Sequence, residues 1–206
     1  MIETKTVPMS DERAVDLAVE VLKAGGLVAF PTDTVYGVAA LAFEPACIER
    51  IYEAKGRETT KAIPILVGTL DQLSQVALML TPAAQKLAQR FWPGALTLVV
   101  PRHPSLPDVL SPIPTVGVRM PDHPFALELL RRAGPLAVTS ANLSGQENPR
   151  TAQDVLAQLE GRIALVVDGG AAPGGVPSTV VDCTGEQARI LRHGAIKDEE
   201  ILKLIS

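Results

Sequence analysis

The 206-residue chain has few aromatic residues, only two cysteines and no excess of positive charge. Aromatic residues make up 3% of the chain while hydrophobic residues make up 47%, so the core has to be built mainly from Val, Leu, Ile and Ala. That composition is typical of sheets covered by helices. The net charge of −4 argues against a general nucleic-acid or membrane-surface binder, because such proteins usually carry a basic excess. A local basic pocket remains compatible with this charge.

The cysteines and the apolar runs also bear on location. Cys47 and Cys183 have neither metal-ligand spacing nor a CxxC partner, which fits a reducing compartment. No apolar run approaches the roughly 20 residues of a membrane span, and the N-terminus lacks a charged region followed by an apolar one. We therefore expect a cytoplasmic protein without a membrane partner.

Hydrophobic periodicity predicts alternating strands and helices. The first helix is expected over residues 10–24, with Ser10 as its N-cap, and residues 101–114 are expected to form a Pro-rich loop. Further helices are predicted at 45–55, 82–91, 124–132, 152–159 and 198–204. Strands are predicted at 27–30, 63–67, 95–100, 116–118, 136–139, 164–167, 179–182 and 188–191. The alternation predicts an α/β fold, with residues 1–206 forming a single domain around an open, twisted, mixed sheet flanked by helices.

Polar residues interrupt this pattern at strand ends. The run 27–40 reads LVAFPTDTVYGVAA, so its first strand ends in residues suited to a ligand site in an open α/β sheet. Similar polar segments are 55–61, 115–119 and 140–142. If these ends converge, the crevice contains the cations Lys55, Arg57, Lys61 and Arg119, which suit phosphates or carboxylates. The alternative is that each cation is a solvated surface group.

Familiar catalytic devices are absent. The sequence has no GxxxxGK[ST] phosphate loop, and Pro173 within the glycine-rich stretch 169–175 indicates a flexible turn or lid. The three histidines are scattered, so no metal site is expected. Ser140 and Ser178 lack an identifiable histidine base, and there is no GxSxG motif. Nothing in the sequence therefore predicts a covalent nucleophile.

Six short motifs nevertheless occur in a recognisable order. They are PTDTVYG at 31–37, KGR at 55–57, FWPG at 91–94, VRMP at 118–121, SAN at 140–142 and PST at 177–179. The chain resembles the YrdC-like threonylcarbamoyl-AMP synthase family, in the short bacterial form that consists of the catalytic domain alone. The resemblance runs from about Ala14 to Gly194, and KxR with SxN favours this activity over relatives that share only the fold.

The resemblance implies a reaction of ATP, L-threonine and bicarbonate that gives threonylcarbamoyl-AMP and pyrophosphate. It implies that Mg²⁺ arrives with ATP, since no DxD pair is present, and that the downstream partner is the machinery that transfers the threonylcarbamoyl group to tRNA. The implied threonine site is Thr34, Arg119, Val138 and Ser178. The implied ATP site is Lys55, Arg57, Lys61, Thr115, Ser140, Asn142, Asn148 and Arg192, with Lys55 and Arg57 as catalytic residues. Leu66 departs from the family pattern, because some members have His beside the threonine.

Two other classes stay open. One is an RNA-binding module of the same fold, or at least weak RNA binding, although the net charge of −4 counts against it. The other is a relative that forms a carbamoyl adenylate from carbamoyl phosphate. Such domains normally lie beside zinc-finger-like and acylphosphatase-like segments, which this sequence lacks, so we rank this class below the RNA-binding module.

Overall fold

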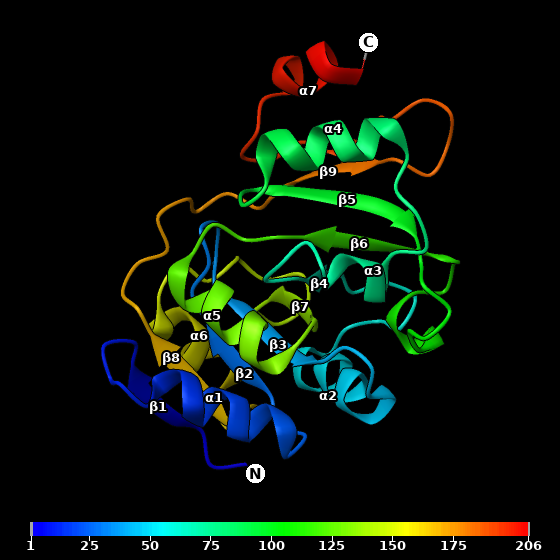
Figure 1. The fold of residues 1–206 in the computed structure, drawn as a ribbon. Coiled ribbons are helices and arrows are strands. Elements are labelled where there is room, and N and C mark those ends of the chain that lie inside the picture. Colours follow the sequence, from blue (N-terminus) through cyan, green and yellow to red (C-terminus); the bar gives the residue numbers. More distant parts are fainter. Residues whose placement is uncertain (1, 206) are drawn as a thin grey trace.

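The computed structural model describes residues 2–205, and its strands form one open mixed sheet flanked by helices (Figure 1). The strands are β1 (Lys5–Pro8), β2 (Val28–Phe30), β3 (Gly37–Leu41), β4 (Ile65–Leu66), β5 (Leu96–Pro101), β6 (Thr115–Arg119), β7 (Leu136–Ser140), β8 (Leu165–Asp168), β9 (Thr179–Asp182) and β10 (Arg189–Arg192). The helices are α1 (Ala14–Lys23), α2 (Pro45–Lys55), α3 (Leu73–Val76), α4 (Pro82–Phe91), α5 (Pro124–Ala133), α6 (Ala152–Leu159), α7 (Asp198–Ile205) and a 3-10 turn, η1 (Asp108–Leu110). The predicted fold class is confirmed.

The strand order is β1-β8-β2-β3-β7-β4-β6-β5-β9-β10. Four neighbouring pairs run parallel, namely β1 with β8, β8 with β2, β4 with β6, and β5 with β9. The remaining neighbours run antiparallel. This order brings strands distant in sequence side by side, such as β3 and β7 near the centre of the sheet and β5 and β9 closer to one edge. That residues 1–206 form a single domain stays a prediction.

Local sequence signals account for several helix ends. Helix α2 has the predicted bounds, because Pro45 occupies its first turn and Gly56 ends it in the left-handed conformation, at φ 56° and ψ 40°. The start predicted for α1 was wrong, since the helix begins at Ala14 and Ser10 does not cap it. Asp11 instead forms a local turn, in which its Oδ1 accepts a hydrogen bond of 2.8 Å from the backbone of Arg13.

Four short elements were not predicted: β1, β3, α3 and η1. The segment 101–114, expected to be only a loop, contains η1 and an isolated bridge between Arg102 and Ala77. A four-residue helix, a 3-10 turn and a four-residue edge strand are too short for a periodic pattern to distinguish them from loops. Strand β3 is buried along most of its length, so its sequence GVAAL lacks the alternation that marks a half-buried strand.

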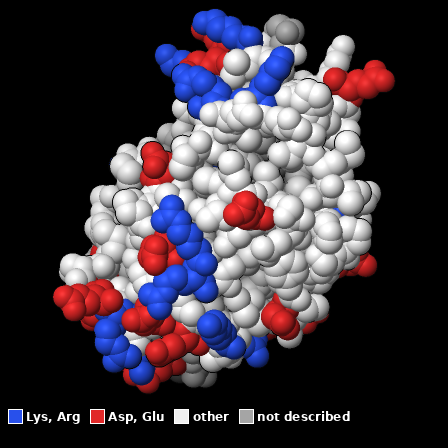
Figure 2. All heavy atoms as spheres, in the orientation of Figure 1, with Lys and Arg blue, Asp and Glu red and all other residues white. Residues whose placement is uncertain are grey.

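The surface in the view of Figure 1 carries positive and negative side chains intermixed, with a broad uncharged area between the charged groups (Figure 2). Ion pairs on α1 and α5 illustrate the mixture, because Arg132 of α5 pairs with Asp16 of α1, and Arg131 lies 3.8 Å from Glu128. No helix within residues 2–205 is both long and apolar enough to cross a membrane.

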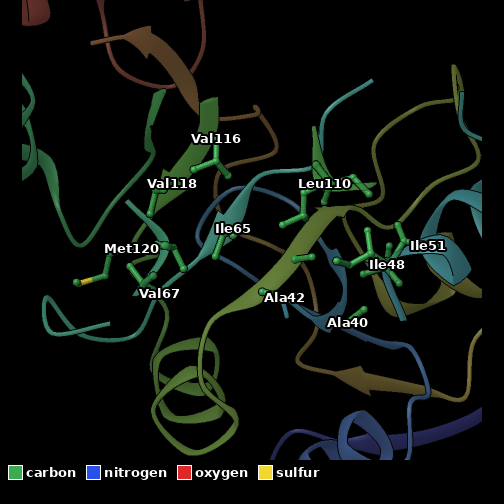
Figure 3. Close-up of a cluster of buried hydrophobic side chains, with 14 of the residues drawn as sticks. Ala40, Ala42, Ile48, Ile51, Ile65, Val67, Leu110, Val116, Val118 and Met120 are labelled. Carbon is green, nitrogen blue, oxygen red and sulfur yellow. The ribbon is translucent and has the colours of Figure 1, made fainter. Parts of the chain in front are cut away.

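Buried aliphatic side chains form two clusters against the sheet. In one, α1 and α5 pack on residues of β1, β2, β3, β4, β7 and β8. In the other, α2, α4 and α6 pack on the opposite face of the sheet, against residues of β2 to β9. Figure 3 shows part of the second cluster, where Ile48 and Ile51 of α2 lie near Leu110, and Val116 and Val118 of β6 lie beyond Ile65. Because side chains alternate along a strand, the residues between them face the opposite side of the sheet. The functional cavity lies on that side.

Candidate active site

A cavity of about 560 Å³ lies over the central strands of the sheet. Its walls come from the segment 32–37 and from β4, β5, β6, β7 and β9. The lining residues are Thr32, Thr34, Val35, Tyr36, Gly37, Arg57, Ala62, Pro64, Leu66, Thr97, Val99, Gly117, Arg119, Val138, Thr139, Ser140, Asn148, Pro177, Ser178, Val180 and Arg192. Three of them are arginines and none is Asp or Glu, so the cavity wall favours anions.

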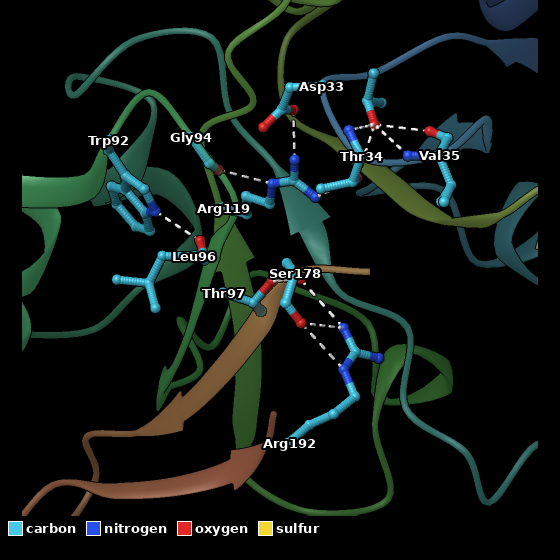
Figure 4. A network of polar contacts seen from close by, with 11 residues as sticks. Asp33, Thr34, Val35, Trp92, Gly94, Leu96, Thr97, Arg119, Ser178 and Arg192 are labelled. Atoms are coloured by element: carbon cyan, nitrogen blue, oxygen red, sulfur yellow. Dashed lines mark hydrogen bonds and ion pairs between the residues drawn. The ribbon is translucent and has the colours of Figure 1, made fainter. Parts of the chain in front are cut away.

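The polar segment PTDTVYG, at residues 31–37, forms one wall of this cavity. Thr32 holds the segment together, because its Oγ1 donates to the carbonyl of Val35 at 2.7 Å and accepts from the backbone N–H groups of Thr34 and Val35 at 3.2 and 3.3 Å. Thr32 is 3% exposed, so these bonds form away from solvent. The turn they stabilise directs Asp33 and Thr34 toward Arg119 of β6 (Figure 4).

The hydroxyl oxygen of Thr34 has one lone pair that accepts no hydrogen bond from the described residues. The Thr32 hydroxyl hydrogen is committed to the carbonyl of Val35, so it is not donated to Thr34 across the 3.0 Å contact between the two hydroxyls. Thr34 Oγ1 accepts from Arg119 Nη1 at 2.9 Å. A hydroxyl oxygen accepts two hydrogen bonds, so one lone pair of Thr34 is left for an N–H or O–H donor of a ligand.

Arg119 is fixed on three sides. Its Nε donates to the carbonyl of Gly94 at 2.9 Å, Nη1 donates to Thr34, and Nη2 pairs with the carboxylate of Asp33. Burial lowers the pKa of Arg119, while the adjacent Asp33 carboxylate acts in the opposite direction. The guanidinium stays charged, because an arginine pKa starts above 12.

The FWPG and VRMP motifs meet at this point. Besides accepting from Arg119, Gly94 donates its backbone N–H to the carbonyl of Met120 at 2.8 Å. Trp92 supports the same turn from the other side, since its Nε1 donates to the carbonyl of Leu96 at 2.7 Å. The turn that ends α4 therefore fixes the position of Arg119, which explains why two motifs distant in sequence belong to one site.

Ser178, at the start of β9, belongs to a second polar cluster on the cavity wall. Its Oγ lies 2.7 Å from Thr97 Oγ1 of β5, and Arg192 of β10 donates to it at 3.1 Å. Arg192 also donates twice to the carbonyl of Ser178, at 2.9 and 3.1 Å. Figure 4 shows this cluster beside Arg119, so a small anionic ligand here would lie between Arg119 and Arg192.

Arg57 and Lys55 were expected to enter the same crevice, and the structure separates them. Arg57 lines the cavity, where its Nε and Nη2 donate to the carbonyls of Lys61 and Ala62 at 3.2 and 3.0 Å. Lys55 is 2% exposed and is not a lining residue, because its Nζ donates to the carbonyls of Ser140 and Asn142. Burial, followed by repulsion from Arg57, lowers the pKa of Lys55 to about 7.

The other predicted site residues also divide into two groups. Those that line the cavity are Thr34, Arg57, Arg119, Val138, Ser140, Asn148, Ser178 and Arg192. Those that do not are Lys55, Lys61, Thr115 and Asn142. Lys61 lies half-exposed, 3.5 Å from Glu58, and Asn142 donates its amide to the carbonyls of Leu143 and Gln146, both at 2.8 Å. Within residues 2–205, Asn142 Oδ1 is buried without a hydrogen-bond partner.

Thr32, Tyr36 and Thr97 line the cavity although none of them was predicted as a site residue. Tyr36 is buried, and its hydroxyl donates to the carbonyl of Gly170 at 2.7 Å and accepts from the backbone of Gly169 at 3.1 Å. A buried threonine or tyrosine whose hydroxyl bonds across strands leaves no pattern in the local sequence. Their position within the motif PTDTVYG was the only available signal, and it was available for Thr32 and Tyr36 alone.

The glycine-rich stretch 169–175, expected to be a flexible turn or lid, is hydrogen-bonded to the site. Besides the contacts of Tyr36, the N–H of Gly175 donates to the carbonyl of Thr34 at 2.7 Å. A Cβ at Gly174 would lie 2.5 Å from the carbonyl oxygen of Asp33, so only glycine allows this approach. The stretch therefore supports the turn that carries Asp33 and Thr34.

A protein-bound metal does not fit the described residues. Within residues 2–205, no three His, Cys, Asp or Glu side chains lie close enough together to hold an ion. The cavity lining has no carboxylate, and Asp33 is paired with Arg119. Any Mg²⁺ in this cavity would therefore have to be held chiefly by a ligand's own oxygens.

An open mixed α/β sheet with a cavity lined by three arginines and no carboxylate is the architecture of a protein suited to anionic small molecules. The sequence model of the Sua5–YciO–YrdC family, described as "telomere recombination", matches residues 20–194. The chain belongs to this family.

Named relatives agree with that assignment. Threonylcarbamoyl-AMP synthase of Bacillus subtilis is 44% identical over 91% of this chain, and the chain spans about half of that protein, 55%. A Mycobacterium tuberculosis protein provisionally named threonylcarbamoyl-AMP synthase is 41% identical, over 96% of this chain and 92% of its own length. The structure of Pyrococcus abyssi Sua5 complexed with L-threonine is 39% identical with a TM-score of 0.93, covering all of this chain and 61% of that one.

Proposed function

We propose that the protein is an L-threonylcarbamoyladenylate synthase, a nucleotidyltransferase that makes threonylcarbamoyl-AMP and pyrophosphate from L-threonine, bicarbonate and ATP. One observation carries the proposal: a single cavity without a lining carboxylate contains two groups of residues. In the first group, the buried Arg119, held by three hydrogen bonds, lies beside Thr34 and Ser178. The second group contains Arg57 and Arg192. The first group suits an amino acid and the second suits a phosphate chain. The identity of about 40% to named synthases supports the assignment.

The chemistry accounts for the absence of a protein nucleophile. The threonine amine and bicarbonate combine to a carbamate with loss of water, and a carbamate oxygen then attacks the α-phosphorus of ATP. The new O–P bond forms as the bond to the β-phosphate breaks, and its electron pair leaves with pyrophosphate. Such a transfer needs in-line positioning and stabilisation of developing charge rather than covalent catalysis.

We assign the threonine end to Thr34, Arg119, Val138 and Ser178. Arg119 has five N–H groups, and the three described bonds leave one on each terminal nitrogen for the threonine carboxylate. The remaining lone pair of Thr34 can accept from the threonine amine or hydroxyl. Val138 supplies an apolar surface, and Leu66 adds another where some family members have His.

We assign the nucleotide to the part of the wall that contains Arg57, Ser140, Asn148 and Arg192. Arg57 is the catalytic residue of this proposal, because its charge would stabilise pyrophosphate as it leaves. Lys55 and Asn142 shape the adjacent turn, and the direct contact with ATP predicted for them stays a prediction. The contacts predicted for Lys61 and Thr115 also stay predictions.

Other parts of the proposal rest on the chemistry of the substrates. Mg²⁺ would enter as the complex with ATP, coordinated by phosphate oxygens, and would neutralise charge on the phosphates. The product is an activated acyl donor, which requires a transfer enzyme, here the tRNA threonylcarbamoyl-transfer machinery. A cytoplasmic location fits that role.

The deciding experiment is incubation with ATP, Mg²⁺, labelled bicarbonate and L-threonine, followed by mass spectrometry of the nucleotides. We expect an AMP adduct that contains both threonine and the labelled carbon. An adduct formed from carbamoyl phosphate without threonine would instead favour the carbamoyl-adenylate alternative. No adduct, with RNA binding that falls steeply with salt, would favour the RNA-binding module, against which the intermixed surface charge counts (Figure 2).

A further inference from the structure

Asp33 is the acidic residue nearest to the proposed threonine site, yet it does not line the cavity. Its carboxylate pairs with Nη2 of Arg119, and the two side chains are 14% and 7% exposed. Figure 4 shows Asp33, Thr34 and Gly94 on different sides of the Arg119 guanidinium. Asp33 therefore contacts the guanidinium outside the cavity lining, and Arg119 lies between it and the site.

The surrounding structure fixes Asp33 as firmly as it fixes Arg119. The Thr32 hydroxyl closes the turn on one side of Asp33, and the stretch 169–175 packs on the other, with Gly174 in close approach to the Asp33 carbonyl. These contacts fix the backbone on both sides of Asp33 and so limit where its carboxylate can lie.

A buried guanidinium needs such a partner for two reasons. Its charge is costly to bury unless it is paired, and its long side chain has several rotamers unless hydrogen bonds select one. Gly94 and Thr34 supply neutral acceptors, and Asp33 supplies the only carboxylate paired with Arg119 among the described residues. All three bonds have the charged guanidinium as donor, and only the bond to Asp33 also has a charged acceptor, so Asp33 is expected to contribute most to the orientation of Arg119.

We propose that Asp33 is a positioning residue for the amino-acid substrate: it holds Arg119 so that the two remaining N–H groups face the ligand carboxylate. This inference rests on the proposed function. Asp33 is not a catalytic residue, because it touches neither substrate nor phosphate. It should affect the affinity for threonine and leave the affinity for ATP unchanged.

The test uses calorimetry of L-threonine and, separately, of ATP with Mg²⁺. Asp33→Ala should weaken threonine binding by roughly tenfold and leave ATP binding within about twofold, since only Arg119 loses its orientation. Asp33→Asn keeps an oxygen acceptor without the charge and should recover part of the affinity. Asp16→Ala, which removes the exposed partner of Arg132, is the matched control and should change neither binding constant.

The possible results separate this inference from the proposed function. If the unmodified protein does not bind threonine, the proposed function fails. If it binds threonine but Asp33→Asn binds equally well or more tightly, Asp33 does not position Arg119, or competes with the ligand for it, and the inference is overturned. Should Asp33→Ala fail to fold, Asp33→Asn alone decides, with a threonine loss of roughly threefold expected.

Discussion

Arg119 and Arg57 line the same cavity, yet the protein holds them differently. Arg119 is 6% exposed and is bonded to a carbonyl, a hydroxyl and a carboxylate, so its charge is partly neutralised and its orientation is fixed. Arg57 is only partly buried and bonds to two neutral carbonyls. The difference indicates a division of labour, because a singly charged carboxylate requires geometry, whereas a phosphate chain requires uncompensated positive charge.

Removing Arg119 should abolish the fixed guanidinium that we assign to the threonine carboxylate. Arg119→Ala should weaken threonine binding by about 1.5–3 kcal/mol, the scale of a hydrogen bond to a charged group, and leave ATP binding largely intact. Calorimetry with each ligand measures both values. Equal losses for threonine and ATP would show that Arg119 is structural or belongs to the nucleotide site.

The same substitution leaves Asp33 buried without its partner, which can destabilise the fold by about 3–5 kcal/mol. The double variant Arg119→Ala with Asp33→Ala removes both charges and provides the control. It should recover stability in thermal unfolding without recovering threonine affinity. Recovery of both would mean that the loss of binding was a consequence of unfolding.

Removing Arg57 tests the part of the cavity that we assign to the phosphates of ATP. Because its contact with pyrophosphate strengthens as charge develops, Arg57→Ala should lower kcat by roughly tenfold or more and raise the KM for ATP by less. Steady-state kinetics on the folded variant gives both constants. A nearly normal kcat would remove Arg57 from the catalytic residues and leave it as a cation that only closes the turn after α2.

The burial of Lys55 should make the free energy of unfolding depend on pH. Its pKa of about 7 lies below the ordinary value of about 10.4, so between these values the folded state binds fewer protons than the unfolded state. Below about pH 7 the lysine is charged in both states, so the full cost of burying the charge lowers the free energy of unfolding. Above about pH 7 the folded state loses the proton first, and the free energy of unfolding rises by at most about 1.4 kcal/mol per pH unit.

Urea unfolding between about pH 7 and about pH 9 measures this slope. The unmodified protein should gain stability relative to Lys55→Met across that range, while a Lys23→Met variant, altered at an exposed residue of α1, should keep the original slope. Parallel profiles for the protein and Lys55→Met would contradict the burial of a titrating lysine at this position.

The smallest effect is expected far from the cavity. Asp16→Ala breaks an ion pair whose side chains are about two-fifths exposed, 43% for Asp16 and 42% for Arg132. Exposed pairs contribute about 0–1 kcal/mol, so thermal unfolding should change little. A larger loss would mean that α1 and α5 depend on this pair more than on their apolar contact.

Parts of this molecule could be predicted because their signals are local. Pro45 and Gly56 mark the ends of α2, and the motif around Thr34 indicated a ligand site where the first apolar run ends. The burial of Lys55 was not predicted, because no local pattern shows that the carbonyls of Ser140 and Asn142 come within reach of its Nζ. The pairing of Asp33 with Arg119 was missed for the same reason, since the two residues lie 86 positions apart in sequence.

The most direct test of the account is pyrophosphate release by the unmodified protein with ATP, Mg²⁺ and bicarbonate, measured with and without L-threonine. If one wall of the cavity holds the amino acid and another holds the phosphates, release should depend on threonine and on bicarbonate together. Pyrophosphate release that is unchanged when threonine is omitted would contradict the assignment of Arg119, Thr34 and Ser178 to a threonine site.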